Sequence, residues 1–155
     1  MVLKKEHQRI MNKPLESRRG QARIVAMRFM FEKELNKDEN LGEAFDRHVA
    51  HLNIREGIAS YARQMVLLCA EHREQIETII SAHLQNWDLK RLSLVDRSVL
   101  KIGVTEFMYM EPVPPAVTIN EMVEVAKIYG SADSPGFVNG VLDAIHKTLK
   151  ERLPP

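Results

Sequence analysis

The sequence contains one cysteine among 155 residues, which excludes an internal disulfide and a cysteine-rich metal site. Cys69 stands in the apolar run VLLCA, and this setting favours a buried structural thiol over a nucleophile. No apolar run approaches the roughly 20 residues that a bilayer-spanning helix needs, and the first fourteen residues lack the apolar stretch of a signal peptide. These absences predict a soluble, cytoplasmic chain with no membrane partner.

A strong net charge is also lacking, since 22 basic residues nearly balance 21 acidic ones. The distribution is uneven, however. Residues 1–33 hold nine Lys and Arg against three Glu, a net charge of +6, whereas the remaining 13 basic and 18 acidic residues give −5. A basic N-terminal segment followed by a mildly acidic remainder is typical of a protein with a local anionic partner, of which nucleic acid is the commonest. The alternative is that the basic segment is a solvated tail.

The sequence has no convincing alternation of apolar and polar residues, the period of a half-buried strand. Apolar residues instead recur at helical spacing, which predicts an all-α bundle of about seven helices joined by short loops. Residues 1–17 are expected to form a flexible basic N-terminal arm. Residues 18–155 are expected to form a single helical domain of two sub-bundles, at about 18–72 and 73–150. The expected helices start at Arg18 and cover about 43–52, 57–72, 76–84, 92–108, 118–130 and 134–145, with a turn at 36–42.

Several local features of these helices are predicted. In the first helix, one apolar stripe leaves Arg19, Arg23 and Arg28 facing solvent or a partner. Apolar residues around the whole circumference of 92–108 predict a central, buried helix, which the run EPVPP then ends. The sequence TINE, Thr118–Glu121, fits a capping box at the start of the next helix, and Gly130 fits a left-handed residue after its end.

The segment SADSPGFVNGVLDAI, residues 131–145, predicts a helix start. Ser134 fits the N-cap and Pro135 the first helical turn. Asp133 beside the helix N-terminus is favoured by the helix dipole.

The residues that follow allow two interpretations. Phe137 near free backbone amides is able to stack on a base, Asn139 to hydrogen-bond it, and Gly140 to admit a close ligand or a neighbouring helix. Alternatively, Phe137 belongs to the core, Gly140 marks a helix crossing, and Asn139 is merely exposed. The residues alone leave both interpretations open.

Motifs for catalysis are missing: there is no glycine-rich phosphate loop and no Gly-x-Ser-x-Gly elbow. His48 and His51 have the i, i+3 spacing of metal ligands, but no third ligand lies nearby in sequence, and surface histidines are the better interpretation. We therefore expect a binding module, with no catalytic residue, metal or cofactor.

The run PPAVTINEMVEVAKIYGSADSPGFVNGVLDAI, residues 114–145, resembles the signature end of the NusB family of bacterial transcription antitermination factors. LVDRSVLKIGVTEFMYMEPVPP, residues 94–115, and ARIVAMRFMFEKEL, residues 22–35, continue the likeness, which covers about residues 18–149. The resemblance implies an all-α fold of two helical sub-bundles. It also implies binding, without catalysis, to the boxA element of nascent ribosomal or phage RNA, shared with the small-subunit ribosomal protein NusE. The resulting complex joins RNA polymerase and other Nus factors. Because some members of the family self-associate, the resemblance also allows a homodimer.

The resemblance assigns RNA-binding positions in two segments. The family's arginine-rich start corresponds to RRGQARI here, where Gly20 and Gln21 separate the arginines and Ile24 replaces an acid. The RNA-binding residues implied are Arg18, Arg19, Arg23, Asp133, Ser134, Phe137 and Asn139.

Two further positions are implied to face NusE, namely Phe31 in the first helix and Asp96 in the V-D-R run. Two other functions remain as alternatives. One is the RNA-holding accessory domain of ribosomal RNA cytosine methyltransferases, although this chain shows no glycine-rich motif for a methyl donor. The other is a protein–protein adaptor that does not bind RNA.

Overall fold

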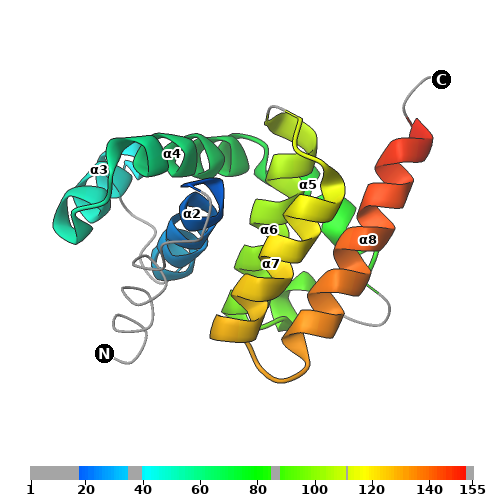
Figure 1. Cartoon of the computed structure of the whole chain (residues 1–155). Coiled ribbons are helices and arrows are strands. Elements are labelled where there is room, and N and C mark those ends of the chain that lie inside the picture. The colour runs from blue at the N-terminus through cyan, green and yellow to red at the C-terminus, as the bar shows by residue number, and fades with distance from the viewer. Residues whose placement is uncertain (1–17, 35–39, 85–87, 111, 153–155) are drawn as a thin grey trace. The chain divides into compact units, whose positions relative to one another are not determined.

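The computed structural model describes residues 18–34, 40–84, 88–110 and 112–152, and within these ranges the chain is helical with no β-strand (Figure 1). The predicted all-α fold is confirmed. The predicted turn at 36–42 lies largely, and residues 1–17 entirely, outside the described residues. No helix in the described ranges is long and apolar enough to cross a membrane. The elements are α2 (Arg18–Glu34), α3 (Leu41–Leu52), α4 (Glu56–Glu71), α5 (Arg73–Ala82), the 3-10 helix η1 (Leu89–Arg91), α6 (Leu94–Tyr109), α7 (Pro115–Tyr129) and α8 (Ser134–Arg152).

The chain divides into two compact units, unit 1 from Met1 to Leu67 and unit 2 from Leu68 to Pro155. Helix α4 begins in unit 1, and its last turn belongs to unit 2. Each unit is described by itself below.

Unit 1 holds together through contacts of α3 with both α2 and α4. The rings of Phe29 and Phe45 meet edge to face, with their centroids 5.2 Å apart. Arg63 on α4 donates to the carboxylate of Asp46 on α3 at 3.0 Å. Helix α3 begins at Leu41, two residues earlier than predicted, because the side chain of Asn40 accepts the Glu43 N–H at 3.0 Å.

Unit 2 is built around α6. Helices α6, α7 and α8 lie side by side, and α5 packs against α6 and α8 (Figure 1). All nine residues from Ser98 to Glu106 are buried, which confirms the predicted central helix. Gly103 lets α8 approach, because a Cβ there would lie 3.0 Å from a methyl carbon of Leu142.

The predicted capping box at Thr118–Glu121 is wrong. Helix α7 already begins at Pro115, where proline is well tolerated because the first helical N–H has no intrahelical partner. Thr118 is therefore an internal helix residue, and its buried hydroxyl donates to the carboxylate of Glu106 on α6. The hydroxyl joins two helices instead of starting one.

The predicted left-handed conformation of Gly130 is also wrong. Its φ of −94° and ψ of −172° are extended. Glycine is required here by close approach, because a Cβ would lie 2.5 Å from the Ser134 hydroxyl oxygen and 2.8 Å from the Ala126 carbonyl oxygen.

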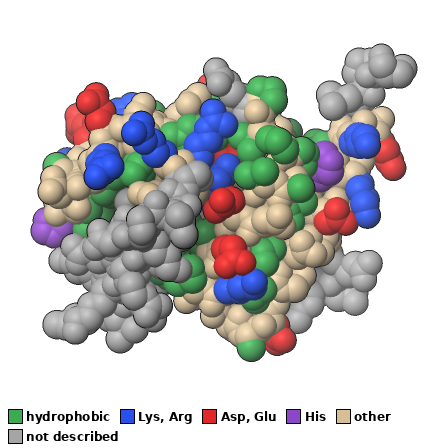
Figure 2. All heavy atoms as spheres, viewed as in Figure 1, with side chains coloured by type: hydrophobic (Ala, Val, Ile, Leu, Met, Phe, Trp, Pro, Cys, Tyr) green, Lys and Arg blue, Asp and Glu red, His purple; other side chains and the backbone are tan. Residues whose placement is uncertain are grey.

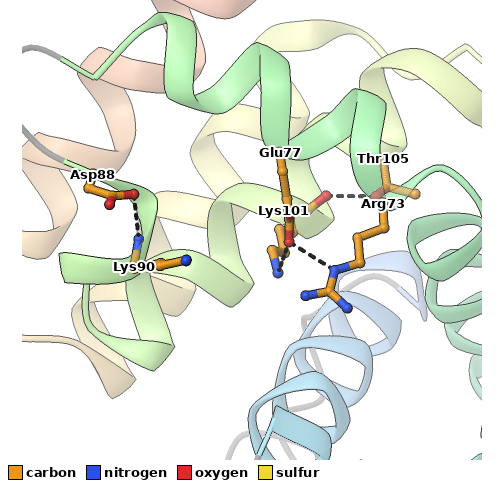
Figure 3. A network of polar contacts seen from close by, with 6 residues as sticks. All are labelled: Arg73, Glu77, Asp88, Lys90, Lys101 and Thr105. Atoms are coloured by element: carbon orange, nitrogen blue, oxygen red, sulfur yellow. Dashed lines mark hydrogen bonds and ion pairs between the residues drawn. The ribbon is translucent and has the colours of Figure 1, made fainter.

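A polar network joins α5 to α6 (Figure 3). The Glu77 carboxylate accepts from the Arg73 guanidinium at 3.0 Å and lies 3.2 Å from Nζ of Lys101, which is 5% exposed. Thr105 donates its hydroxyl to the Lys101 carbonyl at 2.6 Å. Partial burial raises the pKa of Glu77, but hydrogen bonds and charge from Arg73 and Lys101 outweigh it, so the pKa is below its ordinary value.

Gly103→Ala should destabilise the chain by about 1 kcal/mol, although alanine favours a helix over glycine by about that amount. Overpacking a filled core costs about 1–3 kcal/mol, and both Leu142 and Met122, which the new methyl would meet, are fully buried. Urea unfolding checks this, with Gly136→Ala as control because that site has open space. A Gly103→Ala chain more stable than the parent would contradict the packing described.

Glu77→Gln should lower the free energy of unfolding at pH 7 by about 1–3 kcal/mol, because it leaves the Lys101 charge buried without its carboxylate. A carboxyl group whose pKa is lower in the folded state than in the unfolded state stabilises the fold at pH values above its unfolded-state pKa. This stabilisation is lost as the pH falls through the folded-state pKa. The difference between parent and variant should therefore shrink below about pH 4.5. Urea midpoints at pH 7, 4 and 3 measure it, and a difference independent of pH would refute the network's role.

Candidate nucleic-acid interface

The start of α8 is capped differently from the prediction. Helix α8 begins at Ser134, with Pro135 in its first turn as expected. The first helical hydrogen bond runs from the Phe137 N–H to the Asp133 carbonyl at 3.1 Å, so Asp133 and not Ser134 occupies the N-cap position. Ser134 is 1% exposed, and its hydroxyl accepts the Ser131 N–H at 3.0 Å, closing the preceding turn.

One side of α8 is open to solvent along its first two turns. Gly136, Asn139 and Gly140 are exposed and have the i, i+3, i+4 spacing that places residues on one side of a helix. Phe137, on the border of this exposed face, is only half-buried. Phe137 is therefore neither fully buried nor fully exposed, and both interpretations of this residue stay open.

Gly140 distinguishes the two interpretations of this segment further. Among the described residues, no atom of another element lies within 4 Å of the place where its Cβ would be, so it does not mark a crossing of two described helices. Glycine inside a helix costs about 1 kcal/mol relative to alanine. Among the described residues, no neighbour requires the missing side chain of Gly140, and the same is true of Gly136.

The basic start of α2 is only partly exposed. Arg18 and Arg19 are exposed, and the Arg19 guanidinium carbon lies 5.2 Å from the centroid of the Tyr61 ring, a cation–π contact. Arg28 is half-buried and pairs with Glu32 at 3.4 Å. Arg23 is only 1% exposed, so it does not face solvent, which was one of the two environments predicted for it. The prediction from a single apolar stripe on this helix failed because all residues from 22 to 27 are buried.

The positions implied to face a partner are half-buried. Phe31 lies on α2 in unit 1. Asp96 lies in the first turn of α6 in unit 2, where the Ser93 hydroxyl accepts its N–H at 3.1 Å. In the part of the chain that the structure describes, Oδ1 of Asp96 and Nε of Arg97 are buried without a hydrogen-bond partner. An unsatisfied buried carboxylate oxygen is costly, so a donor from another molecule would be favourable here.

His48 and His51 differ from each other in surroundings. His51 is exposed as predicted, but the His48 side chain is 13% exposed, with Nδ1 lying 3.3 Å from the Glu32 carboxylate and the ring against Phe29. Burial lowers the pKa of His48, although the Glu32 charge partly opposes the shift. Within the described ranges, no group of three potential ligands converges on a metal site.

The structure places the implied RNA-binding positions and Phe31 in two groups, whereas Asp96 lies on α6. Asp133, Ser134, Phe137 and Asn139 share the start of α8 in unit 2, whereas Arg18, Arg19, Arg23 and Phe31 share α2 in unit 1. Tyr61, whose ring contacts the Arg19 guanidinium, is not among the sequence-derived positions. Only the fold brings these two side chains together.

Comparison with known proteins establishes the family. The NusB family model matches residues 20–147. A transcription antitermination protein NusB of Syntrophus aciditrophicus is 33% identical over 131 residues, which are 84% of this chain and 81% of that protein. A solved structure of T. maritima NusB superposes with a TM-score of 0.79 at 32% identity, covering 90% of this chain and all of that one.

A second solved structure contains the antitermination factors NusB and NusE in complex with double-stranded RNA. One of its chains matches with a TM-score of 0.77 at 33% identity, covering 84% of this chain and 97% of that chain. These matches define an all-α NusB-like fold, and the chain belongs to the NusB family.

Gly140→Ala should stabilise the fold by up to about 1 kcal/mol while weakening RNA binding, because the methyl group enters space left open on the exposed face. Thermal unfolding and RNA titration on the same sample measure both quantities. Thr78→Ala, a helix-favouring change at an exposed position of α5, is the control. An affinity unchanged by Gly140→Ala would remove the argument from the missing side chain.

Proposed function

We propose that this chain is a transcription antitermination factor. It binds the boxA element of nascent ribosomal RNA together with NusE, and the resulting complex joins RNA polymerase and other Nus factors. The observation that carries the proposal is the exposed face of α8, where Asn139 and an unexplained helical glycine adjoin the half-buried ring of Phe137. Membership of the family supports the antitermination function, and the related NusB–NusE complex with double-stranded RNA supports RNA and NusE as partners.

The site chemistry suits an unpaired RNA strand. Unstacked bases are able to stack on an aromatic ring such as Phe137, and the Asn139 amide offers both donors and an acceptor to a base edge. Arg18 and Arg19 supply guanidinium groups for phosphates. We propose that Arg23, Asp133 and Ser134 act indirectly, by holding the RNA-binding segments of α2 and α8 in their conformations. Arg23 and Ser134 are buried, and Asp133 occupies the N-cap position of α8.

The proposed NusE contact uses Asp96 and Phe31. The unsatisfied Oδ1 of Asp96 gives a donor on NusE a specific acceptor, and the half-buried ring of Phe31 gives an apolar contact. A homodimer that covers the same surfaces would compete with these contacts.

The proposal is tested by fluorescence anisotropy of a single-stranded boxA RNA titrated with the full chain, with and without NusE, at two salt concentrations. We expect binding that weakens as salt rises and tightens when NusE is present. A duplex of the same sequence should bind less well. Binding to NusE with no effect of RNA would establish the adaptor alternative instead.

Phe137→Ala should weaken RNA binding by about 1–3 kcal/mol if the ring stacks on a base. Asp96→Asn should leave binding of the RNA alone unchanged but reduce the tightening that NusE produces, because it removes the charge of the proposed acceptor. The same titrations separate the two effects. A Phe137→Ala chain that folds and binds RNA like the parent would return Phe137 to a packing role.

A further inference from the structure

Arg97, in the first turn of α6, is a half-buried arginine whose side chain has no partner among the described residues. Two other described arginines, Arg28 and Arg63, are half-buried, and they pair with the carboxylates of Glu32 at 3.4 Å and Asp46 at 3.0 Å. Figure 2 shows acidic side chains next to basic ones at several places on the surface. No described residue forms a hydrogen bond or ion pair with the Arg97 guanidinium, although its Nε is buried.

Asp96, the residue before Arg97, lacks a partner of the opposite kind. Its Oδ1 is buried and accepts no hydrogen bond from the described residues, whereas its backbone N–H is bound by the Ser93 hydroxyl at 3.1 Å. The other polar atoms of the two side chains, Oδ2 of Asp96 and both Nη groups of Arg97, are not among the buried unpaired atoms. A buried donor or acceptor without a hydrogen bond has lost its water and gained nothing, so a ligand that supplies both missing partners is stabilised here.

The opposite charges of the two side chains favour a protein over RNA as this ligand. An RNA phosphate that approaches Arg97 also approaches the Asp96 carboxylate, which repels it. A protein segment is able to supply an acid to one residue and a donor to the other. The neighbouring side chains of Leu92, Leu94 and Val95 are apolar and half-buried. An apolar surface that contains an arginine is typical of the buried centre of a protein–protein interface.

We propose that Arg97 is a further NusE-binding residue, and that it pairs with a carboxylate of NusE beside the donor that Asp96 takes. The inference rests on the proposed function and adds the chemistry of the partner's contact segment to it. A carboxylate binds a guanidinium through two parallel N–H···O bonds, and Nε with one Nη forms one edge suited to this. In the free chain the Nε end of this edge is turned into the protein. Rotation of the Arg97 side chain, a change common at interfaces, turns the edge towards NusE.

Arg97→Gln distinguishes a binding role from a packing role. It should weaken NusE binding at least about tenfold, because the NusE carboxylate is left in the interface without its partner. The urea midpoint should not fall, because no described residue loses a hydrogen bond or an ion pair. Lys150→Gln removes an equal charge from an exposed position on α8 of the same unit and should lose less than about threefold. Calorimetric titration of the full chain with NusE measures the affinities.

Two further variants identify the group that Arg97 binds. Arg97→Lys keeps the positive charge but lacks the two-bond edge, so its affinity for NusE should stay at least about fivefold below that of the parent. Arg97→Glu brings a like charge to the NusE carboxylate and should bind at least about tenfold more weakly than Arg97→Gln. Equal affinities of the Glu and Gln variants would refute a carboxylate as the partner, and parent-like binding of the Lys variant would refute the paired N–H contact.

Titration with single-stranded RNA in the absence of NusE separates the two kinds of ligand. Arg97→Gln and Lys150→Gln should bind this RNA equally, and a loss specific to Arg97→Gln would assign the residue to RNA and refute the protein contact. If the parent binds both NusE and the RNA, and Arg97→Gln matches Lys150→Gln towards NusE, the Arg97 contact is refuted and the antitermination function stands. If the parent does not bind NusE, both are refuted. A loss towards NusE confined to the Arg97 variants establishes the contact.

Discussion

The burial of α6 is the constraint on which unit 2 depends. A helix enclosed by α5, α7 and α8 has no water to satisfy its polar side chains, so each must find a partner within the protein. Lys101 reaches the Glu77 carboxylate on α5, and Glu106 accepts the Thr118 hydroxyl on α7. Because these interactions are directional whereas apolar burial is not, they select one arrangement of α5 and α7 around α6. Gly103 then sets how closely α8 approaches.

Helical periodicity was sufficient to predict the fold class and the central position of α6, because a helix that is apolar around its whole circumference must be enclosed on all sides. It failed where tertiary contacts override a local signal. Arg23 belongs to a helix segment buried on all sides, and Thr118 and Ser134 use their hydroxyls for contacts other than the caps that their sequences suggest. Glycine is required at position 130 because the Ser134 side chain lies close to it. The rule that places a left-handed glycine after a helix considers only the backbone.

The candidate site was predictable to the extent that its residues are contiguous. The segment from Asp133 to Asn139 lies on one short stretch of chain, so its motif could be found in the sequence, and its solvent exposure then came from the fold. Tyr61 is distant in sequence from Arg19, whose guanidinium lies over its ring, and no spacing rule connects the two residues. A single sequence does not show which distant residues become neighbours after folding.

The buried environment of Cys69 has a practical consequence for spectroscopy. It is the chain's single cysteine, it is 2% exposed, and burial raises the pKa of its thiol although a hydrogen bond with Thr105 opposes the shift. A thiol that is both shielded and protonated reacts slowly with maleimides. A cysteine introduced at an exposed position such as Arg47 would therefore take up a fluorophore or spin label selectively, with the native Cys69 left in place.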